Sequence, residues 1–171
     1  MNKIVLITGA TSGIGLGCAR KFAANGDKLI LTGRNEQKLE AIRKELADKG
    51  TQVLTLVFDV RDREQATRCI NGLPEEWKEI DVLVNNAGLA LGLEPEYEGS
   101  FDDWETMIDT NIKGLLTMTR LIVPGMVQRD RGHIINVGSG AGDAAYANGN
   151  VYCATESAVK TLTDGLRLDV A

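Results

Sequence analysis

Three glycines near the start of the chain have the spacing of a phosphate-binding turn. Gly9, Gly13 and Gly15 follow the apolar run at residues 4–7 and precede a segment with helical periodicity. A turn from strand to helix brings backbone N–H groups close to a ligand, and the helix N-terminus adds partial positive charge. Glycine also serves turns that bind nothing, but this placement favours a nucleotide. The turn therefore predicts a pyrophosphate site, and the lack of a following Gly-Lys-Ser or Gly-Lys-Thr disfavours NTP hydrolysis.

The end of the second apolar run carries the residue that would choose between cofactors. In dinucleotide sites an acidic residue at this point binds the 2′-hydroxyl of the adenine ribose, whereas an arginine accommodates a 2′-phosphate. This run ends in Gly33-Arg34, which favours NADP over NAD. The nearby acidic residue Glu36 leaves NAD as a second, less favoured possibility. The helix dipole also explains why a glutamate stands in a first helical turn. Alternatively, Arg34 is a solvated surface residue with no role in cofactor binding.

Polar residues also end the third and fourth apolar runs. Asp59 could accept a hydrogen bond from the adenine amino group, or it could cap a helix that begins near Arg61. The fourth run ends in amides and small residues at 85–88, which would let a flat ligand lie against the backbone.

The elements that must position these residues alternate regularly along the chain. Strands are expected near residues 3–8, 27–32, 52–58, 80–84 and 132–138, and helices near 14–25, 36–49, 62–71, 101–128 and 150–170. This alternation predicts one doubly wound, Rossmann-type α/β domain over residues 1–171. Right-handed crossovers give a parallel sheet of order 3-2-1-4-5, with a ligand crevice at the carboxyl ends of strands 1 and 4. Gly114, inside the long fourth helix, indicates either close packing on the sheet or a bend near Asn111.

Composition excludes several other classes of protein. The 171 residues are 43% hydrophobic and 25% charged, with a net charge of −5, so the chain can bury a core and has no basic patch for nucleic acid. Apolar runs are too short for a membrane span, and we recognise no signal peptide. Cys18, Cys69 and Cys153 are widely spaced, which favours free thiols in a reducing cytoplasm. His133 is the one histidine, so we expect no metal site.

Taken together, these motifs resemble the short-chain dehydrogenase/reductase family over essentially the whole chain. The resemblance is carried by Thr8-Gly9-x-x-x-Gly13-x-Gly15, Asn85-Asn86-Ala87-Gly88, Asn111, Ser139 and Tyr152, whose joint occurrence in this order is specific. Residues 83–92, 103–111 and 149–152 look like the bacterial NADP-dependent 3-hydroxy acid dehydrogenases, which also act on serine.

The resemblance implies a role for each of these residues. Tyr152 would be the general acid or base at the carbonyl or alcohol oxygen, Ser139 would hydrogen-bond that oxygen, and Asn111 would hold a water in a proton relay. The reaction would transfer a hydride between NADP(H) and a small hydroxy acid, alcohol or carbonyl compound. The residues implied to bind the cofactor are Gly9, Thr11, Ser12, Gly13, Ile14, Gly15, Arg34, Asn35, Asp59, Val60, Asn86, Ala87 and Gly88. A homo-oligomer formed through the fourth and fifth helices is also implied.

One residue departs from the family pattern. The family has a lysine four residues after the tyrosine, one helical turn along the same face, and this chain has Glu156. A glutamate reverses the charge and disfavours the phenolate of Tyr152. Lys160 would lie roughly 12 Å from Tyr152 along a helix, too far to replace the missing lysine. The alternative to an enzyme is therefore a cofactor-binding chain with impaired catalysis, or a fragment.

The second departure concerns the end of the sheet. The family continues with further strands and a segment that covers the substrate, whereas this sequence stops at Ala171. We therefore expect residues 132–137 to form an uncovered sheet edge, which would invite pairing with another chain.

Overall fold

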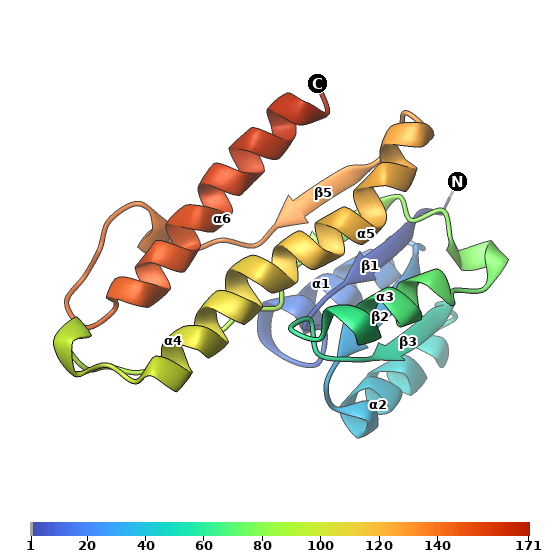
Figure 1. The fold of residues 1–171 in the computed structure, drawn as a ribbon. Helices are drawn as coiled ribbons and strands as arrows, with labels where there is room; N and C mark the ends of the chain where they lie inside the picture. The colour runs from blue at the N-terminus through green and yellow to red at the C-terminus, as the bar shows by residue number, and fades with distance from the viewer. Residues whose placement is uncertain (1) are drawn as a thin grey trace.

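The predicted sheet order is confirmed in the computed structural model, which describes residues 2–171. The strands are β1 (Ile4–Ile7), β2 (Lys28–Gly33), β3 (Val53–Val57), β4 (Val82–Asn85) and β5 (His133–Asn136). They form one parallel sheet of order β3-β2-β1-β4-β5 (Figure 1). In its centre Leu6 pairs with Ile30 on one side and Leu83 on the other. The carboxyl ends of neighbouring strands thus lie at the same edge of the sheet. The polar residues that follow the strands are close together at this edge.

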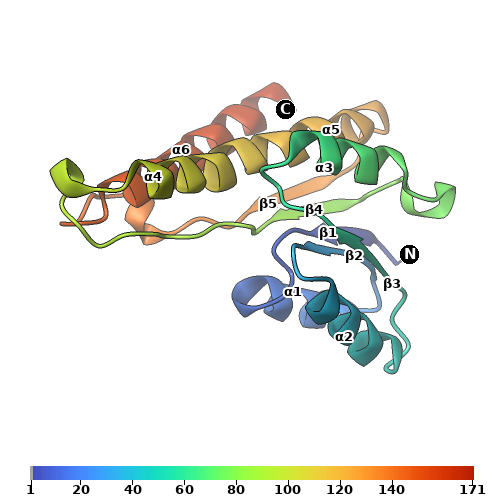
Figure 2. The same ribbon diagram turned by 60° about the horizontal axis from the view of Figure 1, so that its bottom comes forward.

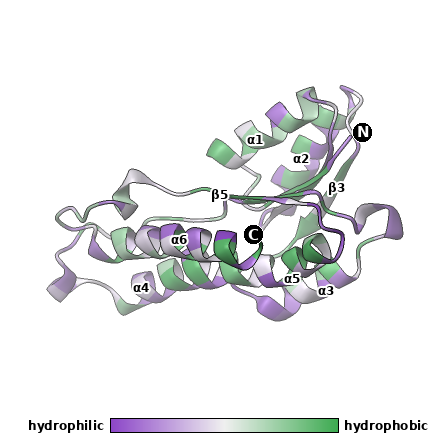
Figure 3. Cartoon of the chain, turned by 90° about the horizontal axis from the view of Figure 1, so that it is seen from above, coloured by the Kyte–Doolittle hydropathy of each residue, from purple (hydrophilic) through white to green (hydrophobic). Residues whose placement is uncertain are grey.

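Six α-helices lie within residues 2–171, and five of them pack on the two faces of this sheet (Figure 2). The six are α1 (Gly13–Ala24), α2 (Glu36–Ala47), α3 (Arg63–Asn71), α4 (Phe101–Ile108), α5 (Leu115–Gln128) and α6 (Asn150–Asp169). Helices α1 and α2 lie on one face, and α3, α5 and α6 lie on the other (Figure 2). Green apolar segments alternate with purple hydrophilic ones along these helices, as expected where one side of each packs inward (Figure 3).

The core is divided by the sheet into two apolar clusters. Val5 and Ile7 of β1 face the cluster beneath α1 and α2, whereas Leu6 faces the cluster beneath α3 and α5. Both faces of the strand are therefore buried, which explains why its sequence is a continuous aliphatic run and not an alternating one.

Side chains cap three of the helices. Asn35 accepts from the Lys38 N–H at the start of α2 (3.0 Å), and Asp62 accepts from the Gln65 N–H at the start of α3 (2.9 Å). Ser100 caps α4. The suggestion that Asp59 caps the third helix is therefore wrong: that helix begins two residues after Arg61, and the oxygen within reach of its free N–H groups belongs to Asp62.

The long fourth helix is continuous but changes its winding. A six-residue π-helix (Asp109–Gly114) joins α4 to α5. A Cβ on Gly114 would lie 2.7 Å from Cγ2 of Val60 in the turn after β3, so the glycine permits close packing on that turn and not on a strand of the sheet. The α-helical winding is broken beside Asn111, and the suggested bend stays a prediction. Such π-helical turns are often found at functional sites.

Strand β5 forms one edge of the sheet, as expected, since its ladder hydrogen bonds are to β4 alone. His133 begins this strand and is exposed. Cys18, Cys69 and Cys153 are free thiols. Within residues 2–171, no helix combines the length and the apolar character needed to cross a membrane.

Candidate active site

A cavity of about 410 Å³ lies at the carboxyl ends of the strands. It is where the strand order reverses, between the turn after β1 and the turn after β4, as predicted. The residues that line it are Gly9, Thr11, Ser12, Gly13, Ile14, Thr32, Gly33, Arg34, Phe58, Asp59, Val60, Asn86, Ala87, Gly88, Leu89, Ala90, Thr110, Val137, Gly138, Tyr152 and Glu156.

The glycine turn forms the middle of the cavity wall. Gly9 has φ +62°, a left-handed conformation that favours glycine. A Cβ on Gly15 would lie 2.2 Å from the Gly9 carbonyl oxygen, so α1 can approach the turn only because residue 15 is glycine. Unlike α2, α3 and α4, helix α1 has no side-chain cap at its N-terminal residue, Ser12. Its first-turn N–H groups are therefore available to a ligand.

Thr8 and Asn86 hold the turns after β1 and β4 together. The Thr8 hydroxyl accepts from the backbone N–H groups of Asn86 and Ala87, both at 3.0 Å. The Asn86 amide donates to the carbonyl oxygens of Thr8 (3.1 Å) and Gly9 (3.0 Å). Asn86 thus lines the cavity and also stabilises the glycine turn. Thr8 belongs to the glycine motif, but the motif alone does not predict this bridging role; its place at the carboxyl end of β1 is the signal for it.

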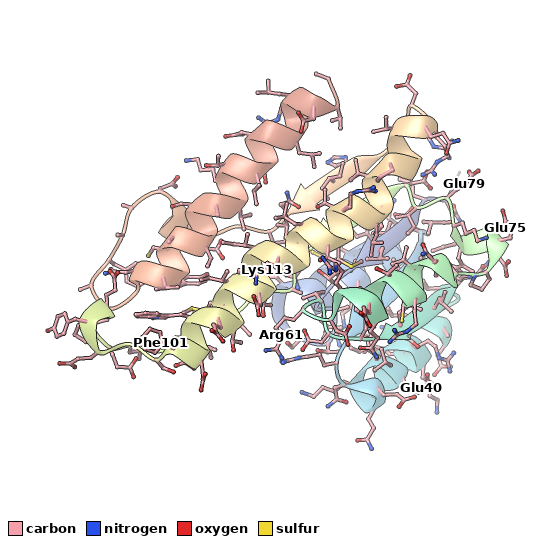
Figure 4. The ribbon with its side chains drawn as sticks, in the orientation of Figure 1. Glu40, Arg61, Glu75, Glu79, Phe101 and Lys113 are labelled. Atoms are coloured by element: carbon pink, nitrogen blue, oxygen red, sulfur yellow. The ribbon has the colours of Figure 1, made fainter. Side chains whose placement is uncertain are left out.

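Positive charge gathers at the β2–β3 end of the cavity. Arg34 is exposed, lines the wall, and has no ion pair or hydrogen bond through its side chain within the described residues. Asp59 instead pairs with Arg61, whose Nη2 lies 2.8 Å from its carboxylate. Burial would raise the pKa of Asp59, but the hydrogen bonds from Arg61 and the charges of Arg61 and Arg34 together lower it. Arg61 projects from the turn after β3, on the side of the π-helix that carries Lys113 (Figure 4).

Two buried hydroxyls in the cavity wall were not predicted from the sequence. The Oγ1 atoms of Thr32 and Thr110 are buried and have no hydrogen-bond partner within the described residues. A buried hydroxyl without a partner is costly, and a bound ligand could satisfy it. Threonine is common at strand ends and in helices, so no local signal distinguishes these two.

Tyr152 reaches the cavity from the first turn of α6 and is half-buried. Ser139 follows β5, is exposed, and accepts from the Ala141 N–H at 3.1 Å. That hydrogen bond uses a lone pair and leaves the Ser139 hydroxyl proton available to a substrate.

Asn111 ties the long loop after β4 to α6. Its Oδ1 accepts from the Leu89 N–H at 2.9 Å, and its Nδ2 donates to the Leu89 carbonyl (2.8 Å) and to Oγ1 of Thr155 (3.0 Å). The side chain of Asn111 is thus occupied by protein partners, and its role in a water relay stays a prediction.

Glu156 stands one turn after Tyr152 and also lines the cavity. The residue is 8% exposed, and its Oε2 has no hydrogen-bond partner within the described residues. Burial raises the pKa of Glu156, and a hydrogen bond from the Ser139 backbone N–H opposes this shift. Lys160 is exposed and paired with Asp143, so it does not take the place of a lysine beside Tyr152.

Most of the residues predicted to bind a cofactor line this one cavity. Gly15 and Asn35 do not: the first packs against Gly9, and the second caps α2. Asn111 and Ser139 are also outside the lining. Across residues 2–171, no group of three or more histidine, cysteine or acidic side chains is arranged to hold a metal ion.

The groups left free in the wall fit a dinucleotide. Uncapped N–H groups of α1 can bind a pyrophosphate, Arg34 can bind a further phosphate, and Gly9, Gly13 and Gly33 line the same wall. Tyr152 at the opposite end can donate a proton to a ligand oxygen.

Known proteins with similar sequences and structures include NADP-dependent dehydrogenases. An NADP-dependent 3-hydroxy acid dehydrogenase of Salmonella typhi is 56% identical over 98% of this chain, and the match covers 66% of that relative. Sulfoacetaldehyde reductase 2 of Chromohalobacter salexigens is 46% identical over 99% of the chain and 68% of the relative. A closed form of serine dehydrogenase complexed with NADP+ superimposes with a TM-score of 0.92 at 51% identity, covering 98% of this chain and 66% of that structure. The chain thus spans slightly less than two thirds of the first of these relatives.

The family model for short chain dehydrogenases matches residues 3–171, a range that includes the glycine turn, Asn86, Asn111, Ser139 and Tyr152. With its parallel sheet of order 3-2-1-4-5 and its cavity at the strand ends, the chain belongs to the short-chain dehydrogenase family.

Proposed function

We propose that this chain is an oxidoreductase that binds NADP(H) and transfers a hydride between it and a small hydroxy acid, alcohol or carbonyl substrate. The observation that carries the proposal is the cavity that contains the uncapped N-terminus of α1, the unpaired Arg34 and Tyr152 together. The relatives whose names state an NADP-dependent 3-hydroxy acid dehydrogenase and a sulfoacetaldehyde reductase support the same reaction class.

The choice of NADP over NAD rests on Arg34. Its guanidinium can pair with a 2′-phosphate on the adenine ribose, and it has no competing carboxylate partner within residues 2–171. Asp59, whose pKa the charge of Arg34 helps to lower, is instead paired with Arg61. A cofactor without the 2′-phosphate would leave Arg34 unpaired.

The other end of the cavity would perform the proton transfer. The bound nicotinamide would supply or accept the hydride, and the protein would orient the substrate and manage one proton. The Tyr152 hydroxyl would donate that proton to the carbonyl oxygen in the direction of reduction, and the Ser139 hydroxyl would hydrogen-bond the same oxygen. Asn111 would act indirectly, since its hydrogen bonds to Leu89 and Thr155 hold the loop against α6.

A second candidate function is a cofactor-binding chain with weak catalysis, and Glu156 favours it. A carboxyl group takes the place of a lysine one turn after Tyr152, and Lys160 is held by Asp143. An ionised carboxylate disfavours the negative charge that Tyr152 acquires when it gives up its proton.

Titration of the whole chain with NADPH and NADH, followed by cofactor fluorescence, tests the proposal. We expect NADPH to bind more tightly than NADH, and Arg34→Ala to weaken NADPH binding about tenfold while NADH binding changes little. Lys38→Ala, at an exposed neighbouring position that does not line the cavity, is the matched control.

Absence of binding by either cofactor contradicts the proposal. Binding without consumption of NADPH in the presence of 3-oxo acids or semialdehydes selects the second candidate.

Two broader expectations accompany this proposal. The free thiols support a reducing compartment such as the cytoplasm. Self-association would involve α4, α5 and α6, as the family resemblance implies, and size-exclusion chromatography with light scattering tests it.

A further inference from the structure

Glu156 is a buried carboxyl group with an unused oxygen. Asp27, the other buried acidic residue, receives hydrogen bonds from the Lys3 N–H and the Asn25 amide, both at 3.0 Å. Glu156 is buried to a similar degree, yet its Oε2 has no partner within the described residues. A buried polar atom without a partner in the protein is well placed to interact with a ligand.

The position of this oxygen along the cavity follows from the strand order. Arg34 and Asp59 follow β2 and β3 at one end, and the glycine turn follows β1 in the middle. Glu156 lies at the other end, where its Oε2 is 3.8 Å from the position of a Cβ on Gly138. A dinucleotide with its pyrophosphate on the glycine turn and its 2′-phosphate at Arg34 would extend its second nucleoside, the nicotinamide, toward Glu156. This step rests on the proposed function.

Charge distinguishes the two forms of that nucleoside. The oxidised nicotinamide ring carries a positive charge, and the reduced ring is neutral. A carboxylate in a poorly solvated wall attracts a nearby cation more strongly than it would in water. The interaction therefore acts on one oxidation state of the cofactor and not on the other.

Within residues 2–171, no charged side chain contributes to the pKa of the Glu156 carboxyl group. This pKa is determined by burial and by the Ser139 N–H. Lys160 on the same helix pairs with Asp143, and Lys113 on the π-helix pairs with Asp109. The other titratable groups on the elements packed around it are Tyr152, Cys153, Asp164, Arg167 and Asp169 on α6, His133 at the far end of β5, and Asp102, Asp103 and Glu105 on α4.

We propose that Glu156 makes the cavity selective for the oxidation state of its cofactor, so that NADP+ binds more tightly than NADPH. The carboxylate attracts the nicotinamide cation and gives no such gain to the reduced ring. The preference is present when Glu156 is ionised and disappears as pH falls and the carboxyl group is protonated.

The test compares the dissociation constants of NADP+ and NADPH, measured by calorimetry on the whole chain and on Glu156→Gln. Glutamine keeps the size of the side chain and removes its charge. Near neutral pH we expect the ratio of the NADPH constant to the NADP+ constant to fall about tenfold in Glu156→Gln. Glu98→Gln, which removes an exposed carboxylate outside the cavity lining, should leave the ratio unchanged. Lowering the pH to about 5 should bring the wild-type ratio toward that of Glu156→Gln.

A measurement on the unmodified chain guards against a variant that fails to fold. Binding of NADP+ near the pKa of Glu156 should release more protons than binding of NADPH, seen as a stronger dependence of the binding enthalpy on the ionisation enthalpy of the buffer. Any proton release from the 2′-phosphate is common to both cofactors. An unchanged ratio in Glu156→Gln that still binds both cofactors, or equal proton release with both, overturns the inference and leaves the proposed function standing. Failure of the unmodified chain to bind either cofactor overturns both.

Discussion

The two ends of the cavity differ in how well their side chains suit NADP-dependent hydride transfer. One end has the groups needed to bind phosphate, whereas the other has a carboxyl group where the family has a lysine. From the middle of the cavity to its β2–β3 end, the uncapped N-terminus of α1 and Arg34 both favour a phosphorylated ligand. At the β4–β5 end Tyr152 and Ser139 are present, but Glu156 puts a carboxyl group one turn after the tyrosine. In the proposed function, the phosphates of the cofactor and the proton transfer would involve different residues, so a change at residue 156 could impair catalysis and leave phosphate binding intact.

Restoring a cation at the second end has the largest expected effect. We expect Glu156→Lys to raise the rate of carbonyl reduction by about a hundredfold, because a cation beside Tyr152 stabilises the phenolate formed when the proton is transferred. The affinity for NADPH at Arg34 and the glycine turn should change little. Steady-state NADPH consumption and fluorescence titration measure the two quantities. The double variant Glu156→Lys/Tyr152→Phe is the control and should lose the gain; no gain in the single variant means that another group activates Tyr152.

Disturbing the first end should affect both folding and binding. Gly15→Ala puts a methyl group 2.2 Å from the Gly9 carbonyl oxygen, and we expect it to lower the free energy of unfolding by about 2 kcal/mol and to weaken NADPH binding. Gly17→Ala in the same helix has no atom within 4 Å of the added methyl group and should stabilise the chain by about 0.5–1 kcal/mol. Urea unfolding and cofactor titration compare them. Equal effects of the two substitutions would contradict the close contact at Gly15.

The smallest expected effect is the pH dependence of stability that Glu156 causes. Burial raises the pKa of its carboxyl group in the folded chain. The folded state therefore holds this proton more tightly than the unfolded state does. Its contribution to stability is fully present below the unfolded pKa and is lost as pH rises through the folded pKa. Urea unfolding from about pH 4 to about pH 8 should show that Glu156→Gln becomes more stable relative to the unmodified chain as pH rises. The opposite trend would mean that the carboxylate has a partner in the folded state.

Much of the fold could be predicted because its signals are local. The aliphatic run at β1 and the helical periodicity of α1 place the glycine turn, and the alternation of elements indicates the parallel order of the sheet. Other details depend on contacts between distant segments. The π-helix at Asp109–Gly114 has no distinctive composition, and the contact between Gly114 and Val60 joins parts of the chain that are 54 residues apart (114 − 60).

In the candidate site, too, some features follow from local sequence signals and others from contacts between distant segments. Arg34 and Tyr152 could be named from their places in motifs. The unpaired hydroxyls of Thr32 and Thr110 could not, because whether a threonine has a partner depends on what packs around it. The hydrogen bonds of Asn111 to Leu89 and Thr155 likewise depend on a loop and a helix that meet only in the folded chain.

The sequence by itself determined which segments form strands, the place of the glycine turn and the charge at residue 156, because these follow from residue types and short-range periodicity. The order of the strands could be predicted once the rule of right-handed crossovers was added. Only the tertiary structure decided that the Glu156 side chain is buried at the end of the cavity with an oxygen free, and that Lys160 is held away by Asp143. Burial and pairing are properties of surroundings assembled from several elements, and they turn an unexpected glutamate into a specific electrostatic feature of the site.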